Sequence, residues 1–150
     1  MKATTICTIL LATGTALAVP TKRAEKAVTI SGLYASQTDK SGFVSFILDD
    51  PNYDEETGAN VSWDRPRNPL TDSRTSDGAY FIHFPGGVND ISVFTMQLER
   101  VKGPESFSVS INDNGNGSAP GTKWKCVTAV GSVVSKKCHY DGNVTVVPSA

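Results

Sequence analysis

The chain has few of the residue types that most often carry chemistry: its 150 residues include three cysteines and two histidines. His83 lies in an aromatic run and His139 directly follows a cysteine, settings in which histidine more often packs or faces water than acts as a base. No G-x-S-x-G turn presents a serine nucleophile, and no Cys/His spacing indicates zinc. The sequence therefore predicts no catalytic residue, no metal site and no cofactor.

Long hydrophobic runs are absent after the N-terminal segment, so we expect no membrane anchor in the rest of the sequence. The N-terminus itself combines Lys2, an apolar stretch over residues 6–17 and the small-x-small pattern Ala16-Leu17-Ala18. These features predict a signal peptide over residues 1–18, cleaved after Ala18, and hence a secreted, extracellular protein. A buried N-terminal helix is the alternative.

A second cut is expected at the dibasic pair Lys22-Arg23, which a kexin-type protease would cleave. Residues 19–23 would then be a short pro-segment, with an ordinary polar linker as the alternative. Residues 24–150 form the predicted secreted domain.

Positive charge is scarce in that domain. Without Lys2, Lys22 and Arg23, the 14 basic residues fall to 11 against 15 acidic ones, a net charge of about −4. Nucleic acids and anionic membranes attract positive fields, so neither is an expected partner. Proteins and neutral small molecules are the expected partners.

The cysteine count supports export. Cys7 lies in the leader, which leaves Cys126 and Cys138 as one pair in an oxidising pathway. The predicted disulfide would stabilise the fold by about 3 kcal/mol through the entropy of the unfolded chain. Two free thiols are the alternative.

The remaining sequence shows alternation of apolar and polar residues, broken by turn residues, and no convincing helical stripe. It predicts an all-β fold: a single compact antiparallel β-barrel or sandwich with one disulfide. Only residues 91–101 admit a rival helix, which the Val/Ile/Thr content disfavours. The expected strands cover residues 28–34, 43–48, 61–63, 80–84, 91–101, 107–111, 124–130, 133–140 and 144–147.

Residues 49–60, 64–78 and 112–122 are expected to be exposed loops. The first holds neighbouring carboxylates, which we interpret as a solvated acidic surface, with a weak calcium site as the alternative: Asp49, Asp50, Asp54, Glu55 and Glu56. The turn-rich segment 113–117 lacks the complete calcium-loop spacing and is predicted to connect a hairpin.

Three N-x-[ST] sequons are candidate glycosylation sites in an exported chain. Asn116 lies in the most loop-like context, Asn143 lies beside a predicted turn, and Asn60 is the third.

Several short motifs resemble the Alternaria major-allergen-like family of small secreted fungal β-barrel proteins. Cys126, eleven intervening residues, Cys138 and then Asn143-Val144-Thr145-Val146 resemble the end of that family. Residues 28–34 and 44–48 look like its first two strands, and residues 80–84 look like its middle aromatic strand. The family usually has an earlier disulfide, but the corresponding region near Asn60 and Thr75 has no cysteine. The resemblance implies an extracellular effector, elicitor or allergen-like protein of fungi, as a monomer or non-covalent dimer.

The leading hypothesis is a non-enzymatic secreted effector that binds a host extracellular defence protein, for which the resemblance suggests the thaumatin-like class. Trp63, Arg65, Arg67 and Arg74 are the candidate interface anchors, since Trp and Arg on loops commonly serve in recognition. The alternative is that these residues cap the fold or face water.

Two other functions remain open. One is a carrier of small apolar or phenolic ligands, with Phe46, Phe94 and Phe107 around a cavity. The other is an inhibitor of host hydrolases, which would present a rigid exposed loop to the enzyme.

Overall fold

The computed structural model describes residues 26–115, 122–128 and 133–149. Ala18, the pair Lys22-Arg23 and the sequon residue Asn116 lie outside the described residues. Every regular element within these ranges is a strand, which confirms the all-β class. The strands are β1 (Val28–Gln37), β2 (Ser41–Asp50), β3 (Glu55–Asp64), β4 (Tyr80–His83), β5 (Val93–Arg100), β6 (Ser106–Asn112), β7 (Trp124–Thr128), β8 (Lys136–Tyr140) and β9 (Val144–Val146).

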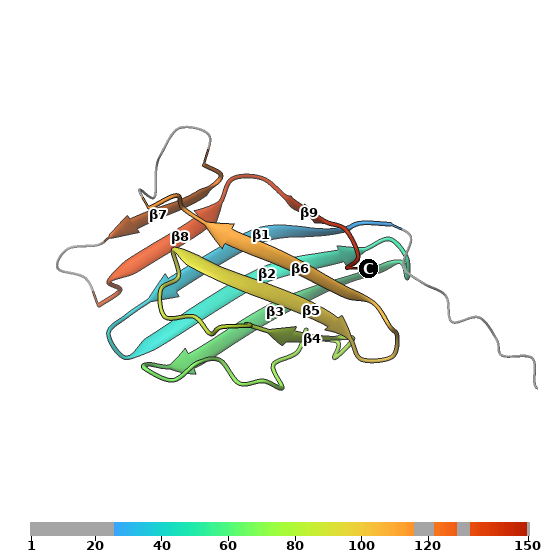
Figure 1. Cartoon of the computed structure of the whole chain (residues 1–150), viewed down its shortest axis with the longest axis horizontal. Helices are drawn as coiled ribbons and strands as arrows, with labels where there is room; N and C mark the ends of the chain where they lie inside the picture. Colours follow the sequence, from blue (N-terminus) through green and yellow to red (C-terminus); the bar gives the residue numbers. More distant parts are fainter. Residues whose placement is uncertain (1–25, 116–121, 129–132, 150) are drawn as a thin grey trace, which may run out of the picture.

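The strands form two antiparallel sheets. The larger sheet has the order β3-β2-β1-β8-β7, with β9 also paired to β1, and the smaller sheet has the order β4-β5-β6. Figure 1 shows the smaller sheet lying across the larger one. In the described ranges the two sheets are connected by an isolated bridge between Phe107 and Pro148, not by a continuous ladder. The fold is therefore a sandwich, and the alternative expectation of a closed barrel is wrong.

Alternating apolar side chains from both sheets fill the space between them. Trp124, Tyr80 and Phe107 are the largest fully buried side chains. Phe94 packs against Phe84 and Trp124, with ring centroids 5.9 Å apart in each pair. Phe46, Phe94 and Phe107 are all buried. These three residues of the ligand-carrier hypothesis therefore belong to the packed core of the sandwich.

The predicted loop over residues 49–60 is wrong. Strand β2 continues to Asp50 and β3 begins at Glu55, so only the turn 51–54 separates two long paired strands. The inward positions Thr57, Ala59 and Val61 alternate with outward polar residues and a glycine. Because two of these inward residues are small or polar, the alternation of apolar and polar residues that predicts a strand is weak here. The predicted strand 61–63 is the last part of β3.

Strand β1 changes partner at a β-bulge. Its first part, Val28–Ile30, pairs with β9, and its last part, Tyr34–Gln37, pairs with β8. The register shifts between Ser31 and Tyr34, where Gly32 has φ of 60°. A glycine adopts this left-handed conformation without steric cost, so it allows the extra residue of the bulge. The bulge thus lets one strand continue along β2 while meeting two partners on its other side.

Candidate functional site

The outer edge of β3 is the first feature of the candidate site. The amide of Arg65 donates to the carbonyl of Lys40, which makes residues 40 and 65 a hydrogen-bonded pair next to the β2–β3 ladder. In an antiparallel ladder such pairs alternate, so Trp63 and Val61 bond to β2. The backbone groups of Asn60 and Ser62 consequently point away from β2. Since β3 ends the strand order of the larger sheet, they face its open edge.

Only the beginning of that edge is covered. The amide of Ser76 donates to the carbonyl of Gly58 at 2.8 Å, and the amide of Asp77 approaches the hydroxyl of Thr57. Among the described residues, no backbone hydrogen bond of this kind reaches Asn60 or Ser62. The second half of the β3 edge is therefore open.

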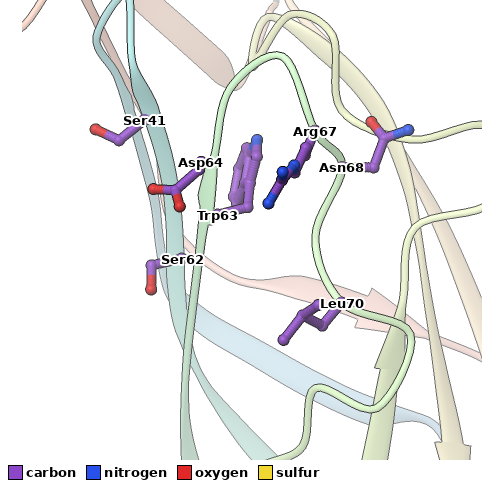
Figure 2. Close-up of a pocket in the computed structure, with 7 residues that line it drawn as sticks. All are labelled: Ser41, Ser62, Trp63, Asp64, Arg67, Asn68 and Leu70. Carbon is purple, nitrogen blue, oxygen red and sulfur yellow. The ribbon is translucent and has the colours of Figure 1, made fainter.

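A groove of about 300 Å³ lies along this open half. It is bounded by β3 on one side and by the segment 67–70 on the other. Figure 2 shows Arg67 and Leu70 extending from that segment towards the strand, whereas Ser62 and Asp64 point away on the other side of β3. Its lining residues are Ser41, Ser62, Trp63, Asp64, Arg67, Asn68 and Leu70.

Trp63, predicted as an exposed loop anchor, is instead an inward residue of β3 with 6% of its surface exposed. Its indole packs so closely on Gly42 that a Cβ at that position would collide with the ring. Its Nε1 is buried and meets no acceptor among the described residues. Trp63 therefore supports the wall of the groove, and its predicted role as an exposed anchor is wrong.

The three predicted arginines have different environments. Arg65 donates to the carbonyls of Thr38 at 3.0 Å and Asn89 at 3.1 Å, so its guanidinium holds two loops together. Arg74 lies over the ring of Phe81, with its Cζ 4.2 Å from the centroid. Arg67 is exposed and makes no ion pair within the described part of the chain. Of the three, Arg67 is the one whose charge is available to a partner.

The segment that carries Arg67 and Leu70 is held in place from behind. The Oδ1 of Asn68 accepts a hydrogen bond from the amide of Val88, and a Cβ on Gly87 would collide with the Asn68 side chain. A second groove of about 300 Å³ lies on that side, lined in part by His83 and Phe84. Leu70 lines both grooves, and 70% of its surface is exposed. Leu70 is thus an exposed apolar side chain on a segment that the Asn68 contacts hold in place.

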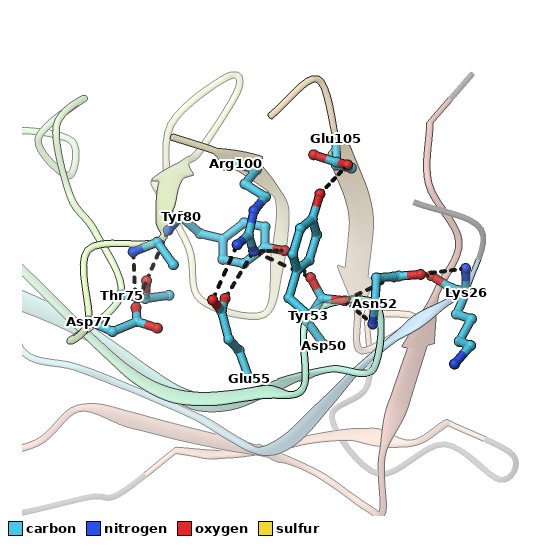
Figure 3. Close-up of polar contacts among 11 residues, drawn as sticks. Lys26, Asp50, Asn52, Tyr53, Glu55, Thr75, Asp77, Tyr80, Arg100 and Glu105 are labelled. Atoms are coloured by element: carbon cyan, nitrogen blue, oxygen red, sulfur yellow. Dashed lines mark hydrogen bonds and ion pairs between the residues drawn. The ribbon is translucent and has the colours of Figure 1, made fainter. Parts of the chain in front are cut away.

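A buried charge cluster forms at the opposite end of β3 (Figure 3). Arg100 donates to both carboxylate oxygens of Glu55, at 3.0 and 3.2 Å, and lies 3.7 Å from the carboxylate of Asp50. The hydroxyl of Tyr80 donates to Asp50 and accepts a hydrogen bond from Arg100. The cluster thus joins β2 and β3 of the larger sheet to β4 and β5 of the smaller one.

Tyr53 and Glu105 extend this cluster. The guanidinium of Arg100 lies over the Tyr53 ring, 3.4 Å from its centroid, and the Tyr53 hydroxyl donates to Glu105 at 2.5 Å. The prediction of a solvated acidic surface is wrong for Asp50, which is buried, and for Glu55, which is paired. Asp50 follows the buried Leu48 by two residues, so the alternation of β2 points its side chain into the core. The sequence Asp50-Pro51 instead indicated a turn, which led to the prediction of an exposed loop.

The contacts in the cluster raise the pKa values of Tyr80 and Arg100. Burial and the hydrogen bond to Asp50 raise the pKa of Tyr80 well above its ordinary value. Burial opposes the charge of Arg100, but the hydrogen bonds with Glu55 and Tyr80 outweigh it and raise the pKa of Arg100. Both shifts favour a charged Arg100 and a neutral Tyr80 beside the carboxylates. We interpret the cluster as a connection between the sheets rather than a reactive centre.

Both histidines lie beside a carboxylate. The Nε2 of His83 is 3.3 Å from a carboxylate oxygen of Glu99, and that of His139 is 3.1 Å from Asp141. In the described ranges, no three His, Cys, Asp or Glu side chains gather in a way that could hold a metal ion. The described ranges also contain no helix with the length and apolar character needed to cross a membrane.

The predicted disulfide is confirmed. Cys126 and Cys138 face each other across the β7–β8 ladder, with their Cα atoms 4.0 Å apart. Two of the predicted sequons lie in the described residues: Asn60 is exposed on β3, and Asn143 is exposed just before β9. Both asparagines are accessible to modification, and their glycosylation stays a prediction.

The fold and the groove define a small disulfide-linked β-sandwich whose β3 edge is partly open among the described residues. Comparisons with protein-family models, with curated proteins and with solved structures gave no match. The resemblance to the Alternaria major-allergen-like family therefore stays a prediction from the quoted motifs.

Proposed function

We propose that this chain is a secreted, non-enzymatic protein that binds a host extracellular protein, in the manner of a fungal effector or allergen-like protein. The single observation that carries the proposal is the groove along β3, where Leu70 and Arg67 lie on a fixed segment, both exposed and the arginine without an ion pair among the described residues. Interfaces commonly combine such an arginine with apolar contacts. The leader pattern and the disulfide support action outside the cell.

The partner class comes from the family resemblance, which makes a thaumatin-like defence protein the first candidate. The site proposed on this chain is the groove along β3. The two parts of the proposal can be tested together, because Arg67 and Leu70 are exposed groove residues that can be replaced while the buried Trp63 is kept.

The experiment compares three immobilised proteins for retention of proteins from plant apoplastic fluid. The first is the unaltered secreted chain, and the second carries Arg67→Ala with Leu70→Ser. The third is a matched control, Lys137→Ala with Val127→Ser, which also removes one exposed cation and one exposed apolar side chain. We expect the first and third to retain the same host protein and the second to lose it.

Two results would count against the proposal. If the unaltered chain retains no host protein above background, protein binding is wrong. If the groove variant and the control retain it equally, binding occurs elsewhere on the surface.

A further inference from the structure

We infer that the partner binds as an extended strand, pairing with the open edge of β3 at residues 60–64. The inference rests on the proposed function of protein binding and specifies its chemistry. The partner segment adds backbone hydrogen bonds to Asn60 and Ser62, places an apolar side chain on Leu70 and directs an acidic side chain to Arg67.

The backbone of β3 provides the first part of the argument. The outward N–H and C=O groups of Asn60 and Ser62 form a short row of donors and acceptors with the spacing of a strand. Such an edge is a template for another extended chain. The neighbouring part of the edge already shows this behaviour, because the segment around Ser76 bonds to Gly58. A partner strand would continue this coverage along the part that remains open.

The groove provides the second part. It runs beside the open groups, with β3 as one wall and the segment 67–70 as the other. Strands pair at a separation of about 4.8 Å, so an added strand would lie within this groove. Its alternate side chains would point towards and away from the core side of the sheet. Leu70 lies where one set of these side chains would pass.

Charge determines the preferred sequence of the added strand. Arg65 and Arg74 are engaged within the chain, whereas Arg67 extends into the groove without an ion pair in the described residues. Asp64 points away from Arg67 on the far side of β3. A glutamate or aspartate in the partner segment therefore complements the groove, and a lysine or arginine at the same place is repelled.

The first experiment uses synthetic peptides and the full secreted chain. The probes are short peptides of alternating valine and threonine with a central glutamate, the same peptides with a central lysine, and a glutamate version with alternate backbone nitrogens methylated. Binding is followed by NMR together with the hydrogen exchange of individual amides. We expect the glutamate peptide to slow exchange at Asn60 and Ser62. We expect the lysine and methylated peptides to bind at least about tenfold more weakly.

The second experiment removes an outward donor from the protein. Ser62→Pro deletes an N–H that does not bond to β2, so an edge strand tolerates it. The matched control is Ser110→Pro, which by the same ladder pattern removes an outward N–H from the edge strand β6. Both are made with Asn60→Gln, because replacing Ser62 also removes a sequon. We expect the Ser62 variant, but not the control, to lose the glutamate peptide and the retained host protein.

Several results would overturn the inference. Peptide binding without slower exchange at Ser62, equal binding of the glutamate and lysine peptides, or no binding at all would each do so. Protection of Ser62 that grows with protein concentration alone would assign the edge to a second copy of this chain instead. If circular dichroism shows that the Ser62 variant does not fold, the comparison of the methylated and unmethylated glutamate peptides tests strand pairing instead. Equal binding of these two peptides would refute it. Host-protein retention that depends on Arg67 and Leu70 but survives Ser62→Pro would leave the proposed function intact and refute strand addition.

Discussion

At the scale of single residues, Arg100 connects the two sheets. Its guanidinium meets Glu55 and Asp50 from the larger sheet and Tyr80 from the smaller one. Asp50 is almost fully buried, and its carboxylate lies 3.7 Å from this guanidinium. Removing one member of a buried ion pair leaves the other without compensation, which costs more than the pair itself contributes.

We therefore predict that Arg100→Met lowers the free energy of unfolding by about 3 kcal/mol, since Asp50 and Glu55 lose their cation. Urea denaturation followed by tryptophan fluorescence measures the change. Lys102→Met is the matched control, because Lys102 is exposed and should change stability by less than about 0.5 kcal/mol. Equal stability of the two variants would show that the cluster does not hold the sheets together.

Of the residues that stabilise the fold, the sequence predicts the disulfide cysteines but not the members of the Arg100 cluster. Cys126 and Cys138 were found because they are the only cysteines that follow the predicted leader. Asp50 was missed although its position follows from the alternation in β2. Arg100 and Tyr80 gave no local signal, because their partners lie 20 to 45 residues away in the sequence. Pairing at that range depends on how the sheets pack.

At the scale of elements, β3 carries the proposed binding edge. One side of its backbone is paired with β2, and within the described part of the chain no backbone hydrogen bond covers the other side at Asn60 or Ser62. The strand itself could be predicted from its last residues, Val61 to Trp63. Its position at the edge could not, because strand order follows from pairing between distant segments. The groove depends on that order and was invisible in the sequence for the same reason.

The backbone arrangement of β3 predicts alternating amide exchange. In the free protein, the amides of Asn60 and Ser62 should exchange much faster than those of Val61 and Trp63, which donate to β2. Residue-resolved hydrogen exchange by NMR provides the measurement. Strand β2 serves as an internal reference, because it is paired on both sides and its amides should all be slow. Uniform protection along β3 would mean that its outer edge is covered in solution.

The β7–β8 hairpin owes part of its stability to the disulfide. Cys126 and Cys138 are separated by 12 positions, and their link restricts the unfolded chain. Replacing both cysteines with serine should lower the free energy of unfolding by about 3 kcal/mol while the far-ultraviolet circular dichroism stays that of a β protein. A variant with unchanged stability would show that the adjacent ladder alone fixes this hairpin.

At the scale of the whole molecule, charge is distributed unevenly. The acidic residues around the β2–β3 turn lie at one end, and the lysines of β7 and β8 lie at the other (Figure 1). Net charge alone concealed this separation. Ionisable groups at several points of the sandwich also couple its stability to pH.

Stability should fall on both sides of a neutral plateau. Hydrogen bonds from Ala79 and Thr75 outweigh burial and lower the pKa of Asp77 below 3.8, so its contribution is present above that value and is lost as pH falls further. The pKa of Tyr80 is raised above 10.0, so its contribution is complete below pH 10 and is lost as pH rises beyond it.

Thermal unfolding from pH 2 to 12 measures both limbs. We expect Tyr80→Phe to make the alkaline decline shallower and to leave the acid decline in place, because Tyr80 is one of two phenols in the cluster with a raised pKa, the other being Tyr53. Asp77→Asn should instead make the acid decline shallower and leave the alkaline decline in place. An alkaline decline of unchanged steepness in the Tyr80 variant would contradict the assignment.

The placement of Trp63 provides the protein with its own optical reporter. The chain has two tryptophans: Trp63 forms a wall of the groove, and Trp124 lies in the core, where its indole donates to the carbonyl of Ile91 at 3.0 Å. With Trp124→Phe, emission would come from the groove alone. Quenching or a spectral shift on titration would then report occupancy directly, without a dye attached to the surface that the partner must reach.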